Sequence, residues 1–278
     1  MRFRSFLLAS VLIGLCGSFV HSQQRQERTR QVVNATIRPW IEKEEPPGVI
    51  VVVHRQGGTE FFPFGEADRE RGVGVSADSM FELASITKVF TTTSLALEVE
   101  AGRMGLRDPV DAYLPALRRG HDIRQVTLEQ LATHTSSLPR TPGQRPGGGA
   151  WDRGAVIQWL EQWRAPHPPG TKSLYSNLAV GVLGYAIAAR EEQPLQAVFE
   201  RQFLHPLGMR HTFFEIPEAD RGLLVRGYGP KGKPVERPEH NTGWPAGGRL
   251  VSSGRDMAKF LAANLGDDVG HPRISRAM

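Results

Sequence analysis

The pattern of apolar positions near the start of the chain predicts a β-hairpin. Pro46 and Pro47 interrupt any preceding helix, and the run 48–54 that follows is apolar and rich in β-branched valine, as in a buried strand. Residues 56–58 supply a glycine-containing turn, and residues 59–64 have the pattern of a returning strand. A lone hairpin is only marginally stable, so other elements must pack against these two strands.

Beyond residue 81 the apolar residues recur at helical spacing. The first such stretch begins at Ser85, and its apolar stripe consists of Ile86, Val89, Phe90, Leu95 and Leu97. Further helices are predicted over 151–163, 178–189 and 195–203, and 141–150 is predicted as a loop rich in Gly and Pro. Because 178–189 is apolar nearly all round, we expect that helix to be buried.

Two helix starts carry capping signals. Thr127 begins a Thr-Leu-Glu-Gln capping box, and Ser252 or Ser253 caps a last helix that Gly266 ends. The residues of this last helix expected to face inward are Met257, Phe260, Leu261 and Leu265.

Together these elements predict an α+β fold, with an antiparallel sheet flanked by helices and a mostly helical part. Residues 23–80 would form the N-terminal part of the α+β subdomain, and residues 81–278 a helical subdomain. The polar segment 23–34 is expected to begin as a loose tail that runs into a helix toward Ile41.

Residues 1–22 have the pattern of a secretory signal peptide. Arg2 and Arg4 precede an apolar run that extends to Val20. The run is short for a membrane span, so no integral span is expected after cleavage. Cys16 is the only cysteine of the chain and would be removed with this segment, which excludes disulfides and thiol catalysis in the mature protein. We therefore expect a periplasmic or secreted protein.

Composition narrows the functional classes further. Hydrophobic residues make up 40% of the 278 residues and charged residues 23%, which is ordinary for a globular protein. Removal of Arg2 and Arg4 would lower the formal charge from +5 to +3, too little and too evenly spread to indicate nucleic-acid binding. The nine histidines lack metal-ligand spacing, so neither a metal nor another cofactor is expected. The absence of a Gly-x-Ser-x-Gly elbow argues against an α/β-hydrolase.

Ser85 and Lys88 are the first candidate catalytic pair. Residues three apart on a helix share a face, so the hydroxyl and the amine would lie side by side. A neutral lysine can take the proton of a serine nucleophile, and a helix start offers backbone N–H groups to a developing oxyanion. The spacing alone is weak, because Ser-x-x-Lys arises by chance about once in a chain of this length.

Tyr175 and Asn177 form a second candidate pair, directly before the predicted buried helix. A short loop against the core can hold a phenol and an amide rigidly beside another helix. A tyrosine next to a lysine can carry the proton of Ser85, because the positive charge favours the phenolate. Asn177 can hydrogen-bond a substrate amide. Taken alone, a tyrosine at such a position is more often a packing residue.

Together the two pairs resemble the serine β-lactamase and penicillin-binding superfamily, in particular class C β-lactamases and their D-alanyl-D-alanine carboxypeptidase/endopeptidase relatives. The likeness runs from about residue 49 to 265. Four segments carry it in addition to the pairs: Leu131-Ala-Thr-His134-Thr-Ser-Ser-Leu-Pro139, with Ser137 where glycine is usual, His205-Pro-Leu-Gly-Met209, Ala246-Gly-Gly248, and Ser252-Ser-Gly-Arg-Asp256-Met257. His134 belongs to a turn held by hydroxyl groups, which favours a structural role over that of a base.

The resemblance implies that Ser85 is the acylated nucleophile and that Lys88 and Tyr175 share the general acid and base roles, without deciding which does what. It also implies that Asn177 binds the substrate's amide. The oxyanion would be bound by the N–H of Ser85 and by a second N–H from a Lys/His-Thr-Gly strand. No such motif is found here: Asn241-Thr-Gly243 lacks the basic residue and precedes Ala246. A truncated gene product, with an incomplete sheet, is the simplest explanation.

The expected function is that of an exported serine hydrolase, which transfers the acyl group of D-Ala-D-Ala peptides or β-lactams through a Ser85 acyl-enzyme. The expected partners are therefore a small-molecule or peptidoglycan-peptide substrate. Two alternatives stay open: an esterase of the same fold, and a catalytically impaired penicillin-binding protein that binds without turnover. The oligomeric state does not follow from the sequence.

Overall fold

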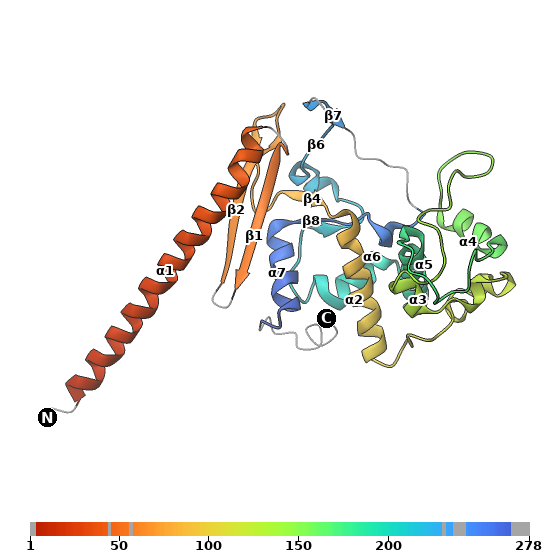
Figure 1. Cartoon of the computed structure of the whole chain (residues 1–278), viewed down its shortest axis with the longest axis horizontal. Coiled ribbons are helices and arrows are strands. Elements are labelled where there is room, and N and C mark those ends of the chain that lie inside the picture. Colours follow the sequence, from red (N-terminus) through yellow and green to blue (C-terminus); the bar gives the residue numbers. More distant parts are fainter. Residues whose placement is uncertain (1–3, 44–45, 56–57, 230–231, 236–242, 268–278) are drawn as a thin grey trace.

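A long helix, α1 (Arg4–Glu42), leads into the hairpin of β1 (Gly48–Arg55) and β2 (Gly58–Asp68) (Figure 1). The computed structural model describes residues 4–43, 46–55, 58–229, 232–235 and 243–267, with side chains from residue 23 onward. The prediction of a loose tail over 23–34 is wrong, since these residues are helical. They are held by contacts between α1 and β2 and by a 2.6 Å hydrogen bond from Arg55 to Thr29. No helix in the described part of the chain is long and apolar enough to cross a bilayer.

The predicted hairpin is confirmed. β1 and β2 are antiparallel with Val51 opposite Phe62, and the short strand β3 (Val73–Gly74) extends the sheet on the β2 side. α1 packs against β2, and the last described helix, α7 (Gly254–Asn264), packs against β1 (Figure 1). Within the described residues β1 pairs with β2 alone, so its other edge is open, and none of its eight residues is fully buried.

A second sheet joins segments that are far apart in sequence. It has the order β4 (Met80–Glu82), β8 (Val251–Ser253), β5 (Thr212–Phe213), with antiparallel pairing throughout. The strands β6 (Gly227–Tyr228) and β7 (Pro234–Val235) form a separate antiparallel pair. The sequence analysis did not predict these strands, because two or three residues are too few to show alternation. The second sheet matters because β4 ends just before Ser85.

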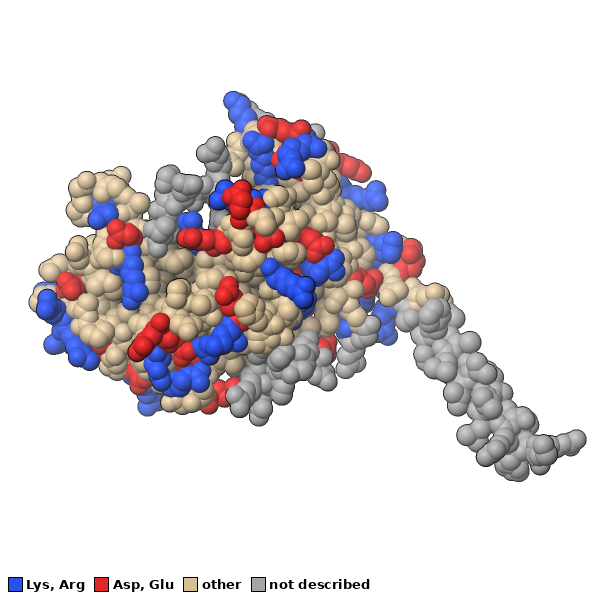
Figure 2. Space-filling model, turned by 180° about the vertical axis from the view of Figure 1, so that it is seen from behind, with Lys and Arg blue, Asp and Glu red and all other residues tan. Residues whose placement is uncertain are grey.

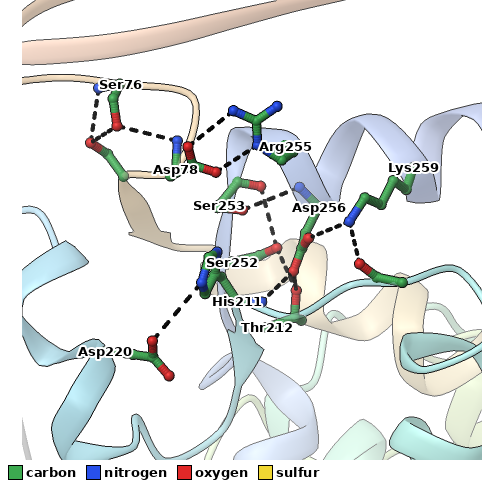
Figure 3. A network of polar contacts seen from close by, with 12 residues as sticks. Ser76, Asp78, His211, Thr212, Asp220, Ser252, Ser253, Arg255, Asp256 and Lys259 are labelled. Atoms are coloured by element: carbon green, nitrogen blue, oxygen red, sulfur yellow. Dashed lines mark hydrogen bonds and ion pairs between the residues drawn. The ribbon is translucent and has the colours of Figure 1, made fainter.

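The carboxylate of Asp256 links β5, β8 and α7 (Figure 3). It accepts the backbone N–H of His211 at 2.6 Å and the hydroxyl of Thr212 at 2.9 Å, and Lys259 approaches it at 3.2 Å. Ser253 caps α7 by accepting the backbone N–H of Asp256 at 3.1 Å, which confirms one of the two predicted caps. Asp256 is 1% exposed, and such a buried charge is tolerated because these donors satisfy it.

The helical part is built around α5 (Asn177–Arg190), which is buried as predicted. The other helices are α2 (Thr87–Glu100), α3 (Leu128–Ala132), α4 (Arg153–Gln162) and α6 (Leu195–Phe199), and α6 continues into the π-helical turn η5 (Glu200–Leu204). Short 3₁₀ turns connect them: η1 (Ala84–Ile86), η2 (Val110–Ala112), η3 (Pro115–Arg119), η4 (Ile123–Gln125), η6 (Glu218–Leu223) and η8 (Pro245–Gly247). The capping box at Thr127 is confirmed, as is the non-helical loop over 141–150.

Close contact between α5 and η8 positions the backbone of Gly247 next to the candidate residue Lys88. A Cβ at Gly181 would lie 2.3 Å from the Cβ of Trp244, so only glycine permits this approach. On its other sides α5 packs fully buried Leu178 and Leu183 into a core that includes Leu131 and Leu160. Each such leucine contributes about 1.5–3 kcal/mol by burial.

Some predicted inward positions are wrong. In α2 and the turn before it, Ile86 is 48% exposed and Val89 44% exposed, whereas Phe90 and Leu95 are buried as expected. The buried face of α2 instead includes polar residues that have partners: Thr91 donates to the carbonyl of Ala246 at 3.0 Å.

Leu261 in α7 and Leu265, which follows the helix as its C-cap, are also exposed. The inward side of this helix is formed by Phe260 and by alanines. Helical spacing locates an apolar face but does not say which neighbours will cover each part of it.

Charged side chains of both signs are interspersed on the face shown in Figure 2. Ion pairs between such side chains include that of Arg255 with Asp78. The described part of this face offers no contiguous basic surface of the kind that binds nucleic acid.

Ser137 takes a backbone conformation that suits glycine. Its φ is 66°, in the left-handed region that costs a residue with a Cβ about 1–2 kcal/mol. The side chain is buried and compensates for this strain, since the hydroxyl donates to the carbonyl of His167 at 2.8 Å and lies 2.6 Å from its Nδ1. The serine that replaces the family's usual glycine therefore has its own hydrogen-bonding role.

We predict that both Ser137→Ala and Ser137→Gly lower the free energy of unfolding, because each leaves the buried groups of His167 without their partner, at about 1–3 kcal/mol. The glycine variant should be the more stable of the two by about 0.5–1 kcal/mol, since it removes the left-handed strain. Urea denaturation of the three proteins measures both differences. An alanine variant as stable as the wild type would show that the hydroxyl contributes nothing, since Ser137→Ala keeps the left-handed strain and removes only the oxygen atom.

Candidate active site

Ser85 lies in η1, at the junction between β4 and α2. The turn is tied to the segment after η8, because Leu83 donates its N–H to the carbonyl of Leu250 at 2.8 Å and Thr87 accepts the N–H of Leu250 at 3.1 Å. Ala84 has a φ of 46°, so the residue before Ser85 is left-handed without being glycine. Backbone strain of this kind persists only where the surroundings fix it, and it is common at active sites.

Lys88 is one turn further along and is 8% exposed. Its ammonium donates to Ser85 Oγ at 3.2 Å, to Asn177 Oδ1 at 2.8 Å and to the backbone carbonyl of Gly247. An ammonium has three N–H groups, and here three oxygen atoms from three segments accept them. The predicted proximity of the amine and the Ser85 hydroxyl is thus observed, and the arrangement fits a protonated lysine.

Tyr175 and Asn177 reach the same place from the start of α5. The hydroxyl of Tyr175 donates to Ser85 Oγ at 2.5 Å, and its ring centroid is 4.8 Å from the Lys88 nitrogen. Between them Ser176 caps α5 by accepting the N–H of Ala179 at 2.8 Å. The structure therefore brings together all four residues that the sequence singled out.

The surroundings of Tyr175 favour its ionised form. Burial by itself would raise the pKa of this phenol. Hydrogen bonding by Lys88 and Ser85, together with the positive charges of Lys88 and Arg140, outweighs burial and holds the pKa below its ordinary value. A phenol with a lowered pKa, 2.5 Å from a serine hydroxyl, is suited to accept that hydroxyl's proton.

His134 supports the loop that carries Tyr175. Its Nδ1 accepts the backbone N–H of Ser176 at 3.2 Å, and its ring centroid is 4.6 Å from that of Tyr175. Burial, and then the charge of Lys88, hold the pKa of His134 below its ordinary value. These contacts agree with the structural role expected from its loop, since a neutral Nδ1 is needed as the acceptor.

Sequence reasoning missed the part that the backbone of Gly247 plays. Its carbonyl is an acceptor for Lys88, and a Cβ at this position would lie 2.6 Å from the backbone oxygen of Asn177. In the sequence, the signal for this close backbone approach is the pair of adjacent glycines in Ala246-Gly-Gly248.

The nearest sequence match to a third motif does not contribute a described group to this cluster. Asn241 lies outside the described residues. Gly243 packs against Trp151, and its carbonyl accepts the hydroxyl of Tyr185. Among the residues that the structure describes, no cluster of three or more His, Cys, Asp or Glu side chains is arranged to hold a metal ion.

We predict that the protein loses stability as the pH falls through the titration of His134. The folded state holds this pKa below the unfolded value of 6.5, so the stabilisation is complete above pH 6.5 and is lost as the pH falls toward the folded pKa. The variant His134→Asn keeps an acceptor near the Nδ1 position, tolerates the left-handed φ of 61° and does not titrate.

Unfolding free energies measured between pH 7.5 and pH 5 should therefore fall more steeply for the wild type than for His134→Asn. This difference in slope reports the lowered pKa of His134, which is caused by burial and then by the charge of Lys88. All other titrating groups are present in both proteins, so their contributions cancel when the two slopes are compared. Equal slopes for the two proteins would remove His134 as the cause.

The sequence of this chain is similar to those of known proteins. The family model described as Beta-lactamase matches residues 33–278. Among curated proteins, a β-lactamase of Pseudomonas fluorescens is 34% identical over 236 residues, which is 85% of this chain. The chain spans 64% of the length of that relative.

Solved structures agree with this similarity. The D-alanine carboxypeptidase AmpC from Burkholderia cenocepacia superposes with a TM-score of 0.80 at 31% identity, covering 91% of this chain and 68% of that one. A class C β-lactamase from Rhodobacter sphaeroides gives a TM-score of 0.77 at 31% identity, with coverages of 87% and 68%. These superpositions confirm the predicted fold class. The family model and these relatives together establish that the chain belongs to the β-lactamase family.

Proposed function

We propose that the protein is an exported serine hydrolase that forms an acyl-enzyme at Ser85 with β-lactams or D-Ala-D-Ala peptides. The observation that carries this proposal is the environment of Ser85 Oγ, which lies 2.5 Å from the phenol oxygen of Tyr175 and 3.2 Å from the amine of Lys88. A nucleophile within hydrogen-bond reach of a base, with the base positioned by a third group, is the arrangement that covalent catalysis requires.

In this proposal Tyr175 is the base and Lys88 stays protonated. All three N–H groups of Lys88 have acceptors, and its charge helps to lower the pKa of the phenol. The phenolate takes the proton of Ser85, and Oγ attacks the substrate carbonyl carbon. When the tetrahedral intermediate collapses, the carbon–nitrogen bond breaks and the departing nitrogen takes the proton back from Tyr175. Water then hydrolyses the ester with Tyr175 in the same role.

Asn177 is proposed to bind the substrate's amide. Its side-chain oxygen already accepts from Lys88 at 2.8 Å, which fixes the orientation of the amide group. The NH₂ end is then directed away from Lys88 and can donate to a carbonyl oxygen of the substrate. The lysine thus orients a substrate-binding group as well as the base.

Oxyanion binding is the step that separates full activity from the impaired alternative. The backbone N–H of Ser85 is the expected first donor, and the sequence has no Lys/His-Thr-Gly motif to supply the second. Loss of one oxyanion donor costs about 10²–10³ in rate. A penicillin-binding protein that turns over slowly is the second candidate, and an esterase of the same fold is the third.

Comparing the hydrolysis of a short acyl ester with that of a chromogenic cephalosporin separates the esterase from the other two. Burst kinetics without steady turnover of the cephalosporin would identify the impaired protein.

The proposal of export rests on residues 1–22, with Arg2 and Arg4 before an apolar run. A periplasmic or secreted location would give access to peptidoglycan peptides. The division into an N-terminal part over 23–80 and a helical part over 81–278 also stays a prediction.

We predict that benzylpenicillin adds its whole mass to the protein, because ring opening retains every atom in the acyl-enzyme. The variant Ser85→Ala should show no mass increase and should still unfold cooperatively, with a lower midpoint because Lys88 loses one of its three acceptors. Intact-protein mass spectrometry measures the adduct. An adduct of undiminished yield on Ser85→Ala would reject Ser85 as the nucleophile.

We predict that Tyr175→Phe slows acylation about 10²- to 10⁴-fold, the usual contribution of a general base. Phenylalanine keeps the ring that contacts Lys88 and His134, so the change isolates the hydroxyl. Stopped-flow measurement of acylation across pH 6–9 tests this. If Tyr175→Phe keeps the wild-type rate, the base must be assigned to Lys88 instead.

A further inference from the structure

An exposed cation lies at the rim of the site, beside Tyr175. The guanidinium carbon of Arg140 is 5.5 Å from the centroid of the Tyr175 ring, and the Arg140 side chain is exposed. The ring is itself 42% exposed, and its hydroxyl lies 2.5 Å from Ser85 Oγ. Tyr175 therefore contacts both Arg140 and the proposed nucleophile.

The backbone of Arg140 is fixed to the start of α5. Its carbonyl accepts the N–H groups of Asn177 at 3.0 Å and Leu178 at 3.3 Å. The preceding carbonyl, of Pro139, accepts the hydroxyl of Ser176 at 2.6 Å. The guanidinium is consequently attached at a defined point next to Asn177, and only its own side-chain rotamers are free.

The positive charge of Arg140 has no carboxylate partner within the described part of the chain. Lys88, the other cation of the site, is bound by neutral oxygen atoms of Ser85, Asn177 and Gly247. Two cations therefore flank the ring of Tyr175, one buried and one exposed. A guanidinium presents paired N–H groups whose geometry matches a carboxylate.

We propose that Arg140 binds a carboxylate on the acyl part of the substrate and so makes the site selective for substrates with an anionic acyl side chain. The inference rests on the proposed function, because it takes Asn177 as the group that binds the amide of that acyl part. Since the backbones of Arg140 and Asn177 are hydrogen-bonded, a carboxylate within a few bonds of the amide comes within reach of the guanidinium. Arg140 thereby acts as a specificity-determining residue.

Two penicillins provide a matched pair of probes. Carbenicillin differs from benzylpenicillin only by a carboxylate on the carbon next to its side-chain carbonyl. Binding is measured by calorimetry on Ser85→Ala, so that no chemistry is needed. We expect carbenicillin to bind about two- to fivefold more tightly than benzylpenicillin, in line with one charge pair at an exposed site. The preference should shrink as salt is added.

In Ser85→Ala/Arg140→Gln the preference for carbenicillin should disappear, and in Ser85→Ala/Arg140→Lys part of it should remain. The matched control is Ser85→Ala/Arg124→Gln, which removes the same charge from the exposed side chain of Arg124 in η4, a turn that packs against η2 and η3. This control should keep the preference. Thermal unfolding of each variant checks that the exposed substitutions leave the fold intact.

Three outcomes would overturn the proposal: equal binding of the two penicillins, no binding of either, or a preference that survives Arg140→Gln. If Arg140 acted only through Tyr175, its removal would change both affinities equally and leave their ratio unchanged. Failure of the proposed function is seen separately, by mass spectrometry of the chain with Ser85 intact. Absence of an acyl adduct there, with the preference for carbenicillin retained, would reject acyl transfer but support the anion site.

Discussion

A buried ammonium with three acceptors is the interaction on which the rest of the site depends. Lys88 joins α2, α5 and η8 through Ser85, Asn177 and the carbonyl of Gly247. A charge that is 8% exposed is tolerated only where oxygen atoms replace its hydration, so each acceptor must arrive at the right place. The close approach of η8 to α5 at Gly181 serves this requirement, since it carries the Gly247 carbonyl to the lysine.

Three tyrosines of this protein differ in their roles according to their neighbours. Burial, followed by hydrogen bonding to Asp108, raises the pKa of Tyr113 to about 12. Burial likewise raises the pKa of Tyr185, whose hydroxyl donates to a backbone carbonyl. Of these three tyrosines only Tyr175 lies between two cations, and it alone of the three has a lowered pKa. Position relative to positive charge, and not residue type, distinguishes the reactive phenol from the structural ones.

The sequence predicted what is encoded locally. The hairpin follows from the valine run and its turn, and the caps at Thr127 and Ser253 follow from side chains that bond to their own helix. The convergence of Ser85 with Tyr175 was predictable only because two short patterns occur together in a recognisable family order.

The features that the sequence did not predict depend on tertiary contacts. The sheet of β4, β8 and β5 consists of two- and three-residue strands, and no local sequence pattern predicts their pairing. The exposure of Ile86 and the helical state of 23–34 depend on which surfaces come to lie beside them. Arg140 gave no signal in the sequence, because an exposed arginine in a loop becomes informative only when the tyrosine beneath it is known.

The left-handed Ala84 has a consequence for the energetics of the proposed reaction. Holding a residue with a Cβ at a φ of 46° costs about 1–2 kcal/mol, and this strain arises during folding and not during each reaction cycle. The direction of Ser85 is then set by the main chain before any substrate arrives. Because Tyr175 and Lys88 also hold the hydroxyl of Ser85, the geometry of attack is inherited from the folded state and does not have to be assembled anew in every cycle.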